Sequence, residues 1–393
     1  MIEEILCDFP RIQFWEETFE KKPAILGNNH SLSKIFSIDD FDQYISDHEG
    51  GLHDRVRISL NGKAIDIPSY LGHAEPQRSF IISNFSSGAT LKLEDLEFRH
   101  GAISKICTSL EQQFGGHCFA KPFLTGPNHH GLNVHFDTTE VFVIQLEGTK
   151  EWKIWARSEE NPTLAMQRRL DPNELGDALI QTTLTPGDIL YIPAGAAHAA
   201  RSLDTSSLHM AIGLTPVKLF ELLENQIRIM SESTPILRKN IFPWSNKKEV
   251  NLWLKETINS FRDIEIKDII NNTAIATNAT KPDTSSKRLR TVGSADQLNI
   301  DTRLELRQGI SVATRQTEST LRVYYSSTLS KGKPAIEHPT FLQMPITCVD
   351  AVTKILEKRQ KIFTPQDISD DFDETSKLMI CRQLLKAGIL TLL

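Results

Sequence analysis

Cysteine is scarce in this sequence and none of it occurs in a paired motif. The 393 residues include five cysteines, and no two of them have the CxxC spacing that is typical of zinc ribbons and redox motifs. An odd number of scattered cysteines argues against a disulfide framework and favours reduced, mostly buried thiols. The five are Cys7, Cys107, Cys118, Cys348 and Cys381. We therefore expect a protein of a reducing compartment, the cytoplasm.

Long apolar runs and an excess of positive charge are also missing. No stretch is apolar for long enough to span a bilayer, and residues 1–6 do not have the basic start of a secretion signal. The net charge of -6 argues against broad, nonspecific binding of nucleic acid. No internal repeat of solenoid period is present. These absences predict a cytoplasmic protein without membrane contact, for which nucleic acid is not the expected partner.

The middle of the chain has the alternation of apolar and polar residues that is typical of strands. We predict five strands from this pattern, each bounded by turn residues, and they enclose a loop at 126–131 that is rich in Gly, Pro, Asn and His. The strands are Cys118–Thr125, Val141–Leu146, Lys150–Trp155, Ile189–Ile192 and Ser207–Gly213. Many short strands around a small-ligand site favour a jelly-roll or cupin barrel, a double-stranded β-helix, in an α+β protein.

The segments before this region predict a mixed helical and strand addition to the barrel. Residues 14–19 have helical spacing, and 22–26 indicate an extended strand. Ser37 with Asp40 three residues later is a capping-box pattern, and 55–68 alternate around Asn61-Gly62, a hairpin signal. Apolar residues at helical intervals predict one helix over 93–114.

After Pro216 the pattern becomes helical, and we predict the rest of the chain as three further parts. Residues 1–215 form the catalytic barrel and 216–270 a helical region with helices at 219–230 and 250–261. Residues 271–302 are polar and predict a flexible linker. In 303–393, three short helices at 349–356, 364–368 and 377–385, followed by a terminal strand at 389–392, resemble a winged helix.

Two histidines and one aspartate stand out as candidate metal ligands. His135 and Asp137 are two residues apart in an expected strand, so both side chains should project from one face. His198 follows a Pro-Gly-Asp turn and an apolar strand, and should reach the same interior. Two imidazoles and a carboxylate can occupy one face of an octahedral ion, the arrangement of non-haem Fe(II) oxygenases. A lone HxD is common on surfaces, and zinc accepts the same ligands, so these alternatives stay open.

Lys150 strengthens the oxygenase interpretation. It alternates with Glu151 on the predicted strand and shares a face with Trp152 and Ile154. A buried ammonium is costly unless an anion meets it. One carboxylate of 2-oxoglutarate would satisfy this need while the other end of the molecule chelates iron, with Thr125 as a candidate hydroxyl partner. The alternative is that Lys150 lies at the rim and extends into water.

With these residues in place, the sequence resembles the JmjC-type ribosomal oxygenases, the cupin subfamily that hydroxylates side chains of ribosomal proteins. The likeness covers residues 10–215 by motif and extends more loosely to the C-terminus. It rests on four stretches, Phe14-Trp15 through Lys22-Pro23, His135 through Trp152, Leu190 through His198, and Ser207-Leu208-His209. The resemblance implies that His135, Asp137 and His198 bind Fe(II), that Lys150 binds 2-oxoglutarate, and that 216–265 form a homodimer interface.

The sequence departs from the family pattern at positions that we expect at the mouth of the pocket. Lys121 and Phe123 stand where the family usually has Asn and Tyr, and Ala194 replaces a commonly basic residue. His129 and His130 lie in an altered loop, where a solvated pair or a substrate contact are both open. His209 is expected to be a satisfied residue of the sheet and not a fourth ligand. These departures do not change the expected type of reaction, but they leave open which side chain is hydroxylated.

The hypothesis is therefore a dioxygenase that uses Fe(II), 2-oxoglutarate and dioxygen to hydroxylate a side chain of a protein or peptide, by resemblance of the ribosomal-protein type. A second interpretation keeps this chemistry but gives it a natural-product precursor peptide. A third is a non-enzymatic adaptor that binds through the winged-helix tail. The tail's candidate recognition helix carries only Lys377, Arg382 and Lys386 as cations and follows an acidic run, which disfavours DNA.

Overall fold

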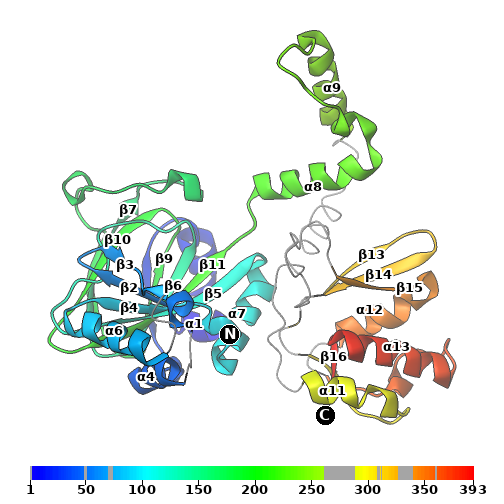
Figure 1. The fold of residues 1–393 in the computed structure, drawn as a ribbon, viewed down its shortest axis with the longest axis horizontal. Coiled ribbons are helices and arrows are strands. Elements are labelled where there is room, and N and C mark those ends of the chain that lie inside the picture. Colours follow the sequence, from blue (N-terminus) through cyan, green and yellow to red (C-terminus); the bar gives the residue numbers. More distant parts are fainter. Residues whose placement is uncertain are drawn as a thin grey trace. The chain divides into compact units, whose positions relative to one another are not determined.

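The computed structural model describes residues 2–47, 51–69, 74–260, 288–307, 310, 312–325, 340–358 and 361–393. The chain divides into two compact units, Met1–Pro216 and Val217–Leu393, which are described separately (Figure 1). Within the described ranges, every helix is too short or too polar to cross a lipid bilayer.

Two antiparallel sheets form the first unit. The larger sheet has eight strands in the order β1-β9-β6-β11-β5-β4-β2-β3, and the smaller has three in the order β10-β7-β8. The strands of the larger sheet are β1 (Ala24–Asn28), β2 (Val56–Leu60), β3 (Lys63–Ile65), β4 (Thr90–Leu93), β5 (His117–Thr125), β6 (Glu140–Glu147), β9 (Asp188–Ile192) and β11 (Ser207–Thr215). Those of the smaller sheet are β7 (Lys150–Arg157), β8 (Ile180–Leu184) and β10 (Ala196–Ser202).

Helices cover one face of the larger sheet. They are α1 (Ile2–Leu6), α2 (Arg11–Gln13), the π-helical turn η1 (Phe14–Thr18), α3 (His30–Ser33), α4 (Ile38–Ser46), α5 (Leu52–Arg55), α6 (Ala74–Ser86) and α7 (Gly101–Phe114). The 3-10 turns are η3 (Leu96–Phe98), η4 (Leu164–Met166) and η5 (Pro172–Glu174). Apolar side chains of the segments before β5, among them Phe14, Phe41, Ile81 and Leu110, share one core with Phe142, Tyr191 and Met210 of the sheet. Because alternate residues of a strand face opposite sides, the other face is free to line a barrel interior.

The barrel interior lies between the two sheets. Val143 of β6 and Leu190 of β9 pack there against Trp152 and Ile154 of β7 in a separate apolar cluster. At one end this cluster gives way to polar side chains, and that end holds the candidate site. The double-stranded β-helix predicted from the alternation is thus present as two facing sheets.

Local signals in the N-terminal addition account for several elements. Ser37 and Asp40 form the predicted capping box at the start of α4, with the Ser37 hydroxyl accepting from the Asp40 N–H at 3.0 Å. Asn61 and Gly62 both have positive φ, 52° and 71°, as a two-residue type I′ hairpin requires. That turn joins β2 to β3, as predicted.

One predicted helix is wrong in its first part. The pattern over 93–114 indicated a single helix, but β4 ends at Leu93 and Asp95 has a φ of 60° in the left-handed region. A helix cannot run through that conformation, so the turn η3 comes first and α7 begins only at Gly101. The helix α6 was not anticipated, because Phe80, Ile81 and Ile82 are adjacent and not spaced at helical intervals.

The second unit contains helices and two small sheets. It includes α8 (Leu219–Ser233), η6 (Pro235–Arg238), α9 (Lys247–Ser260), α11 (Arg288–Gly293), η7 (Ala295–Gln297), η8 (Ile346–Cys348), α12 (Val349–Glu357), η9 (Pro365–Asp367) and α13 (Glu374–Ala387). β12 (Leu304–Leu306) pairs with β16 (Leu390–Leu392), and β13 (Val312–Gln316), β14 (Thr320–Tyr325) and β15 (Phe341–Pro345) form a three-stranded sheet.

The predictions for this unit compare with the structure as follows. Helices occur at 219–233 and 247–260, near their predicted bounds, while Phe261 and residues 262–270 lie outside the described residues. Of the predicted linker, 271–287 also lie outside them. Residues 288–302 contain α11 and η7, where Ala295 and Leu298 are buried in the core of the tail. The middle helix of the tail is reduced to the single turn η9.

Candidate active site

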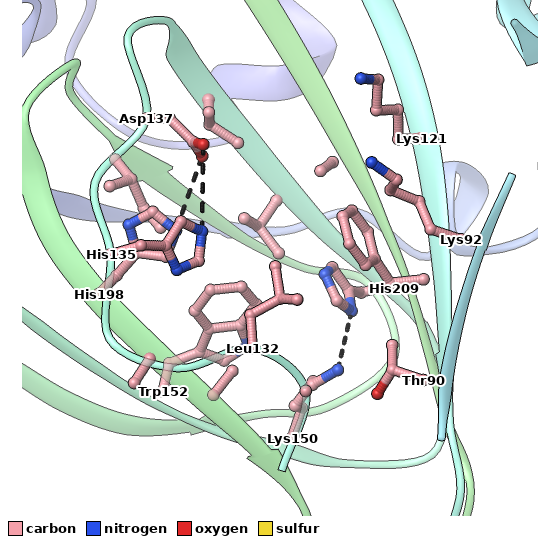
Figure 2. A pocket seen from close by; sticks show the side chains of 18 of the residues that line it. Thr90, Lys92, Lys121, Leu132, His135, Asp137, Lys150, Trp152, His198 and His209 are labelled. Carbon is pink, nitrogen blue, oxygen red and sulfur yellow. Dashed lines mark hydrogen bonds and ion pairs between the residues drawn. The ribbon is translucent and has the colours of Figure 1, made fainter. Parts of the chain in front are cut away.

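A cavity of about 250 Å³ opens at the polar end of the barrel (Figure 2). Its walls come from both sheets: β4, β5, β6, β9 and β11 on one side, β7 and β10 on the other. All five residues predicted to act on metal or co-substrate belong to this region. His135, Asp137, His198 and Lys150 line the cavity, and Thr125 is bonded to Lys150 beneath it.

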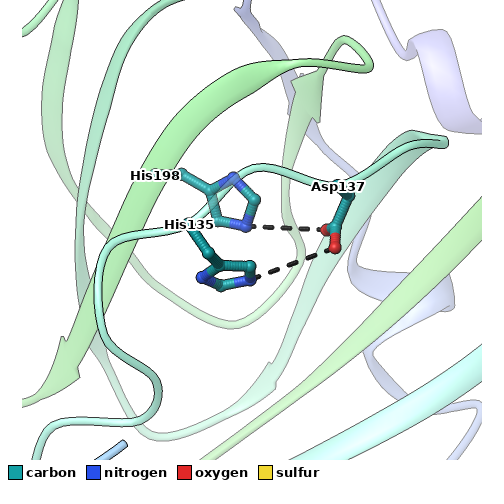
Figure 3. A group of neighbouring side chains, drawn as sticks. All are labelled: His135, Asp137 and His198. Carbon is teal, nitrogen blue, oxygen red and sulfur yellow. Dashed lines mark ion pairs between the residues drawn. The ribbon is translucent and has the colours of Figure 1, made fainter. Parts of the chain in front are cut away.

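His135, Asp137 and His198 converge on one point (Figure 3). Their candidate ligand atoms all lie within 4.8 Å of one another. Nε2 of His198 is 3.6 Å from one Asp137 oxygen, and Nε2 of His135 is 4.0 Å from the other. This is the largest convergence of metal-ligating groups that the described residues offer, and it unites residues 63 positions apart in the chain.

The way in which His135 reaches this point differs from the prediction. We expected His135 and Asp137 on one strand, but the segment is a loop and His135 only forms an isolated bridge with His198. In that bridge the His198 N–H donates to the His135 carbonyl at 2.8 Å. The Asp137 carbonyl accepts from the Gly195 N–H, also at 2.8 Å. Backbone bonds to the β10 region, not strand pleating, therefore place both ligands.

The backbone also sets the orientation of both imidazoles. Nδ1 of His135 is 2.8 Å from the carbonyl of Asn133, and Nδ1 of His198 is 3.0 Å from that of Ala196. A carbonyl only accepts, so each Nδ1 carries the proton and each Nε2 presents its lone pair. Burial, followed by the proximity of His135, lowers the pKa of His198 to about 4. His198 is therefore neutral at physiological pH, the state in which imidazole binds metal.

The donor set fits a divalent first-row metal ion. Two imidazoles and one carboxylate meet at the edge of a cavity, so positions on the cavity side remain open to ligands other than protein. Structural zinc sites are closed by a fourth protein ligand, and none of the other described residues joins this group. An open site of this composition suits a redox metal such as Fe(II), whereas catalytic zinc can use the same three donors.

Lys150 lies in the same cavity and is buried, with 1% of its surface exposed. Its Nζ donates to Thr125 Oγ1 at 2.9 Å and lies 3.3 Å from Nδ1 of His209. Neither partner carries a negative charge. Burial accordingly lowers the pKa of Lys150 to about 7. The structure thus places a buried cationic group that has polar partners but no anion among the described residues, and it does not support the alternative of a rim lysine.

His209 supports this lysine and takes no part in the metal group. Its ring stacks on Phe123 at a centroid distance of 5.0 Å and meets Trp152 edge-on at 5.2 Å. Burial, and then the charge of Lys150, holds the pKa of His209 well below its ordinary value. The neutral ring can therefore accept from the ammonium, which agrees with the expectation of a satisfied sheet residue.

Three polar residues near the cavity were missed in the sequence. Thr90 Oγ1 lies 3.0 Å from Thr125 Oγ1, and Lys92 lines the cavity beside it. Glu94, one residue beyond β4, forms ion pairs with Lys92 at 2.6 Å and with Lys121 at 3.0 Å. The alternation of Thr90 and Lys92 with Leu91 and Leu93 was the available signal, but a strand of four residues was too short to recognise.

The positions where the sequence departs from the family pattern divide into two groups. Lys121 and Phe123 line the cavity, as predicted. His129, His130 and Ala194 were also expected at the mouth, but they are not among the residues that line the cavity. His129 packs against Gly88, His130 bridges to Arg201, and Ala194 is buried with its N–H donating to Glu140 at 3.2 Å. Backbone bonds hold the loop of His129 and His130 against the end of β10, with the Asn128 N–H donating to the Leu203 carbonyl and the Ser202 N–H donating to that of His129.

Comparison with known sequences agrees with this geometry. The sequence model of the JmjC domain family matches residues 96–222, which span the barrel strands from β5 to β11 and all three candidate ligands. This chain contains a JmjC domain. The JmjC domain and its flanks resemble ribosomal oxygenase 1 of Rattus norvegicus, with 29% identity over 221 residues, 54% of this chain and 36% of the relative.

A second relative is the bifunctional lysine-specific demethylase and histidyl-hydroxylase NO66 of Drosophila persimilis. It is 30% identical over 224 residues, 53% of this chain and 31% of the relative. The chain thus spans about a third of the length of the curated relatives it matches. The predicted resemblance to the JmjC-type ribosomal oxygenases is confirmed.

Solved structures confirm the fold around the JmjC domain. The Escherichia coli ribosomal oxygenase YcfD aligns with a TM-score of 0.56 at 15% identity, covering 98% of both chains. Its complex with cobalt and 2-oxoglutarate aligns with a TM-score of 0.57 at 14% identity, again over 98% of each chain. At this identity the likeness establishes the JmjC-type cupin fold and nothing further.

Proposed function

We propose that this protein is an Fe(II)- and 2-oxoglutarate-dependent dioxygenase that hydroxylates an amino-acid side chain of a protein or peptide. The observation that carries the proposal is the pairing, in one cavity, of the group formed by His135, Asp137 and His198 with the buried cation Lys150. Relatives named as oxygenases and hydroxylases, and a related fold solved with cobalt and 2-oxoglutarate, support it.

The residues of this chain would have separate roles in the reaction. His135, Asp137 and His198 would hold the iron, and Asp137 would offset part of its charge. Bound Fe(II) would supply the activation of dioxygen, coupled to oxidative decarboxylation of 2-oxoglutarate to succinate and carbon dioxide, that inserts one oxygen atom into a C–H bond. Trp152 and Ile192 line the cavity with apolar surface and exclude water from the reacting groups.

Lys150 and Thr125 would bind the far carboxylate of 2-oxoglutarate. Burial of the charged Lys150 ammonium costs free energy, and a bound anion would offset this cost, since a nearby opposite charge favours the charged form. Thr125 already accepts from Lys150, and its own hydroxyl lies beside Thr90. Hydrogen bonds within the protein therefore hold both groups in position, which reduces the entropy lost on binding.

The substrate is proposed to be a protein or peptide, and a ribosomal protein by analogy with the names of the relatives. Lys121 and Phe123, which replace the family's usual residues, line the cavity. They leave a natural-product precursor peptide as a second candidate substrate for the same chemistry.

The helical region is proposed to form a homodimer with a second copy of this chain. Phe220, Leu223 and Ile227 follow one face of α8 and are 46%, 39% and 41% exposed. On α9, Leu252, Leu254 and Ile258 are more than half exposed. Apolar surface of this extent on two neighbouring helices is typical of an interface.

The tail is proposed to be a winged-helix-like domain that does not bind nucleic acid. The cations of its candidate recognition helix α13 are engaged within the domain. Lys377 donates to the Gln366 carbonyl at 3.2 Å, Arg382 to that of Leu298 at 3.3 Å, and Lys386 pairs with Asp296 at 2.8 Å. These contacts disfavour the adaptor hypothesis.

The proposal is tested by measuring succinate formed from 2-oxoglutarate in the presence of Fe(II), with His135→Ala and Asp137→Ala as variants. His30→Ala, at an exposed site on α3, is the control. We expect turnover in the wild type and the control and its loss in both site variants. Undiminished turnover in the two site variants would show that the metal assignment is wrong.

A further inference from the structure

A second charged group lies on the wall formed by β4 and β5. Lys92 of β4 and Lys121 of β5 both pair with Glu94, at 2.6 Å and 3.0 Å. All three side chains are between 17% and 27% exposed, so they are partly shielded yet accessible. Figure 2 shows the two ammonium groups on the opposite side of the cavity from the group formed by His135, Asp137 and His198.

The strand register explains why these cations face the cavity. Lys92 pairs with Phe123, and Phe123 pairs with His209, so these three residues form one row on the inner face of the larger sheet. Lys121 is two residues before Phe123 and so faces the same side. On the outer side of Lys92, Arg57 of β2 continues the row to the exposed rim.

The charges in this group do not balance. One carboxylate, that of Glu94, meets two ammonium groups. Burial alone would raise the pKa of Glu94, but the hydrogen bonds and charges of Lys92 and Lys121 hold it below its ordinary value. Glu94 is therefore ionised, and one positive charge remains in excess. Each ammonium has three N–H donors, and the ion pair with Glu94 uses one of each.

When Fe(II) and 2-oxoglutarate are bound, the other charges of the cavity would not offset this excess positive charge. An iron dication and the Lys150 ammonium would together cancel the Asp137 carboxylate and the 2-oxoglutarate dianion. The net charge that a substrate meets would then come from Lys92, Glu94 and Lys121, with Arg57 at the rim. A guanidinium or ammonium entering here would be repelled, and a carboxylate would be attracted.

We infer that Lys92 and Lys121 form a specificity subsite that binds an acidic side chain of the substrate, adjacent to the residue that is hydroxylated. The inference rests on the proposed function and names its substrate class as a peptide segment with Asp or Glu. The rings of Phe119 and Phe123, which lie 4.6 Å and 5.8 Å from the nearest lysine Nζ, provide an apolar wall for the carbon chain of that residue.

The test uses three fluorescent peptide pools of equal length, with the variable positions enriched in Glu, Gln or Arg. Binding to the full-length protein loaded with Mn(II) and 2-oxoglutarate is measured by anisotropy at low salt. We expect the Glu pool to bind about tenfold more tightly than the Arg pool, the effect of two partly exposed ion pairs. This preference should fall with added salt.

Variants distinguish binding at this subsite from a general effect of the protein's charge. Lys92→Met with Lys121→Met should abolish the preference for the Glu pool. Lys63→Met with Lys153→Met, two exposed lysines outside the cavity, removes the same charge and should preserve it. Glu94→Gln should strengthen binding of the Glu pool, because it removes the anion that competes for both lysines. A purely structural role for Glu94 would give no such gain.

Other outcomes would overturn the inference, and one would instead overturn the proposed function. No saturable binding of the Glu pool, or equal binding of all pools, would show that the lysines do not select an acidic group. A weaker affinity for 2-oxoglutarate in the variant that lacks both lysines would show that Lys92 and Lys121 bind the co-substrate and not the peptide. If the wild type binds neither metal nor 2-oxoglutarate, the proposed function fails. Binding of the three peptide pools to the metal-free protein would then still show whether the lysines prefer an acidic side chain.

Discussion

His135 and His198 hold each other in place through their backbones. The two residues form an isolated bridge, with His198 N–H to His135 O at 2.8 Å and His135 N–H to His198 O at 3.3 Å, and their rings lie 4.4 Å apart. One of the two is in a regular strand, β10, and the other is in a loop. The backbone bonds to β10 therefore determine the position of the loop ligand.

The first prediction concerns metal binding and stability. Because three donors already converge, Mn(II) at about 100 times its dissociation constant should stabilise the folded protein by roughly 2.7 kcal/mol. His198→Ala should remove most of this gain, and a chelator should reverse it. Thermal unfolding with and without metal measures the effect. An equal gain in wild type and variant would mean that the metal binds elsewhere.

The second prediction concerns the buried cation. Burial lowers the pKa of Lys150 to about 7, whereas a lysine of the unfolded chain titrates near about 10.4. Between these values the unfolded chain holds a proton that the folded chain has lost, so stability increases with pH in this window. Below it, both states are protonated and the full cost of the buried charge is present.

We therefore expect the unfolding free energy of the wild type, relative to Lys150→Met, to increase with pH above about 7, by up to about 1.4 kcal/mol per pH unit. Lys153→Met, on the exposed side of the same strand, should follow the wild type. Denaturant titrations without metal or co-substrate measure the difference. Parallel curves for wild type and Lys150→Met would contradict the prediction.

The third prediction links the β2–β3 hairpin to the metal group. A Cβ on Gly62 would lie 2.2 Å from the side-chain amide of Asn133, and the backbone carbonyl of the same residue is hydrogen-bonded to Nδ1 of His135. Gly62→Ala should shift that carbonyl and weaken metal affinity by roughly tenfold, as other losses of support to a metal-binding histidine do.

Gly51→Ala is a matched control for this change. Gly51 has nearly the same φ, 73° against 71°, but a Cβ there meets no atom of the described residues within 4 Å. Both variants carry the same backbone strain, and only Gly62→Ala disturbs Asn133. Equal metal affinities in the two variants, measured by calorimetry, would show that the hairpin does not position His135.

The fourth prediction concerns the proposed homodimer. Phe220→Asp with Ile227→Asp places two charges on the exposed apolar face of α8 and should shift the protein from dimer to monomer. Glu224→Gln, on the same helix but exposed and already polar, should leave the mass unchanged. Light scattering coupled to size exclusion measures the outcome. A monomeric wild type would refute the dimer.

Much of the fold could be predicted because its signals are local. Period-two alternation located β5, β6, β7, β9 and β11 but not β8 or β10. Asn61-Gly62 located the hairpin, and Ser37 with Asp40 located the start of α4. These signals arise from backbone conformation and side-chain direction within a few residues. They failed where strands were short, as for β4, and where a left-handed residue, Asp95, interrupted a helical pattern.

The sequence by itself determined the chemistry of this protein: which residues can ligate a metal, and that a lysine would lie on the same buried face as Trp152. Only the tertiary structure decided how they meet. His135 and Asp137 converge through backbone bonds to His198 and Gly195, and Lys92, Glu94 and Lys121 become neighbours only when β4 pairs with β5. Residue types and short spacings are written in the chain, whereas contacts between distant segments depend on the packing of the whole barrel.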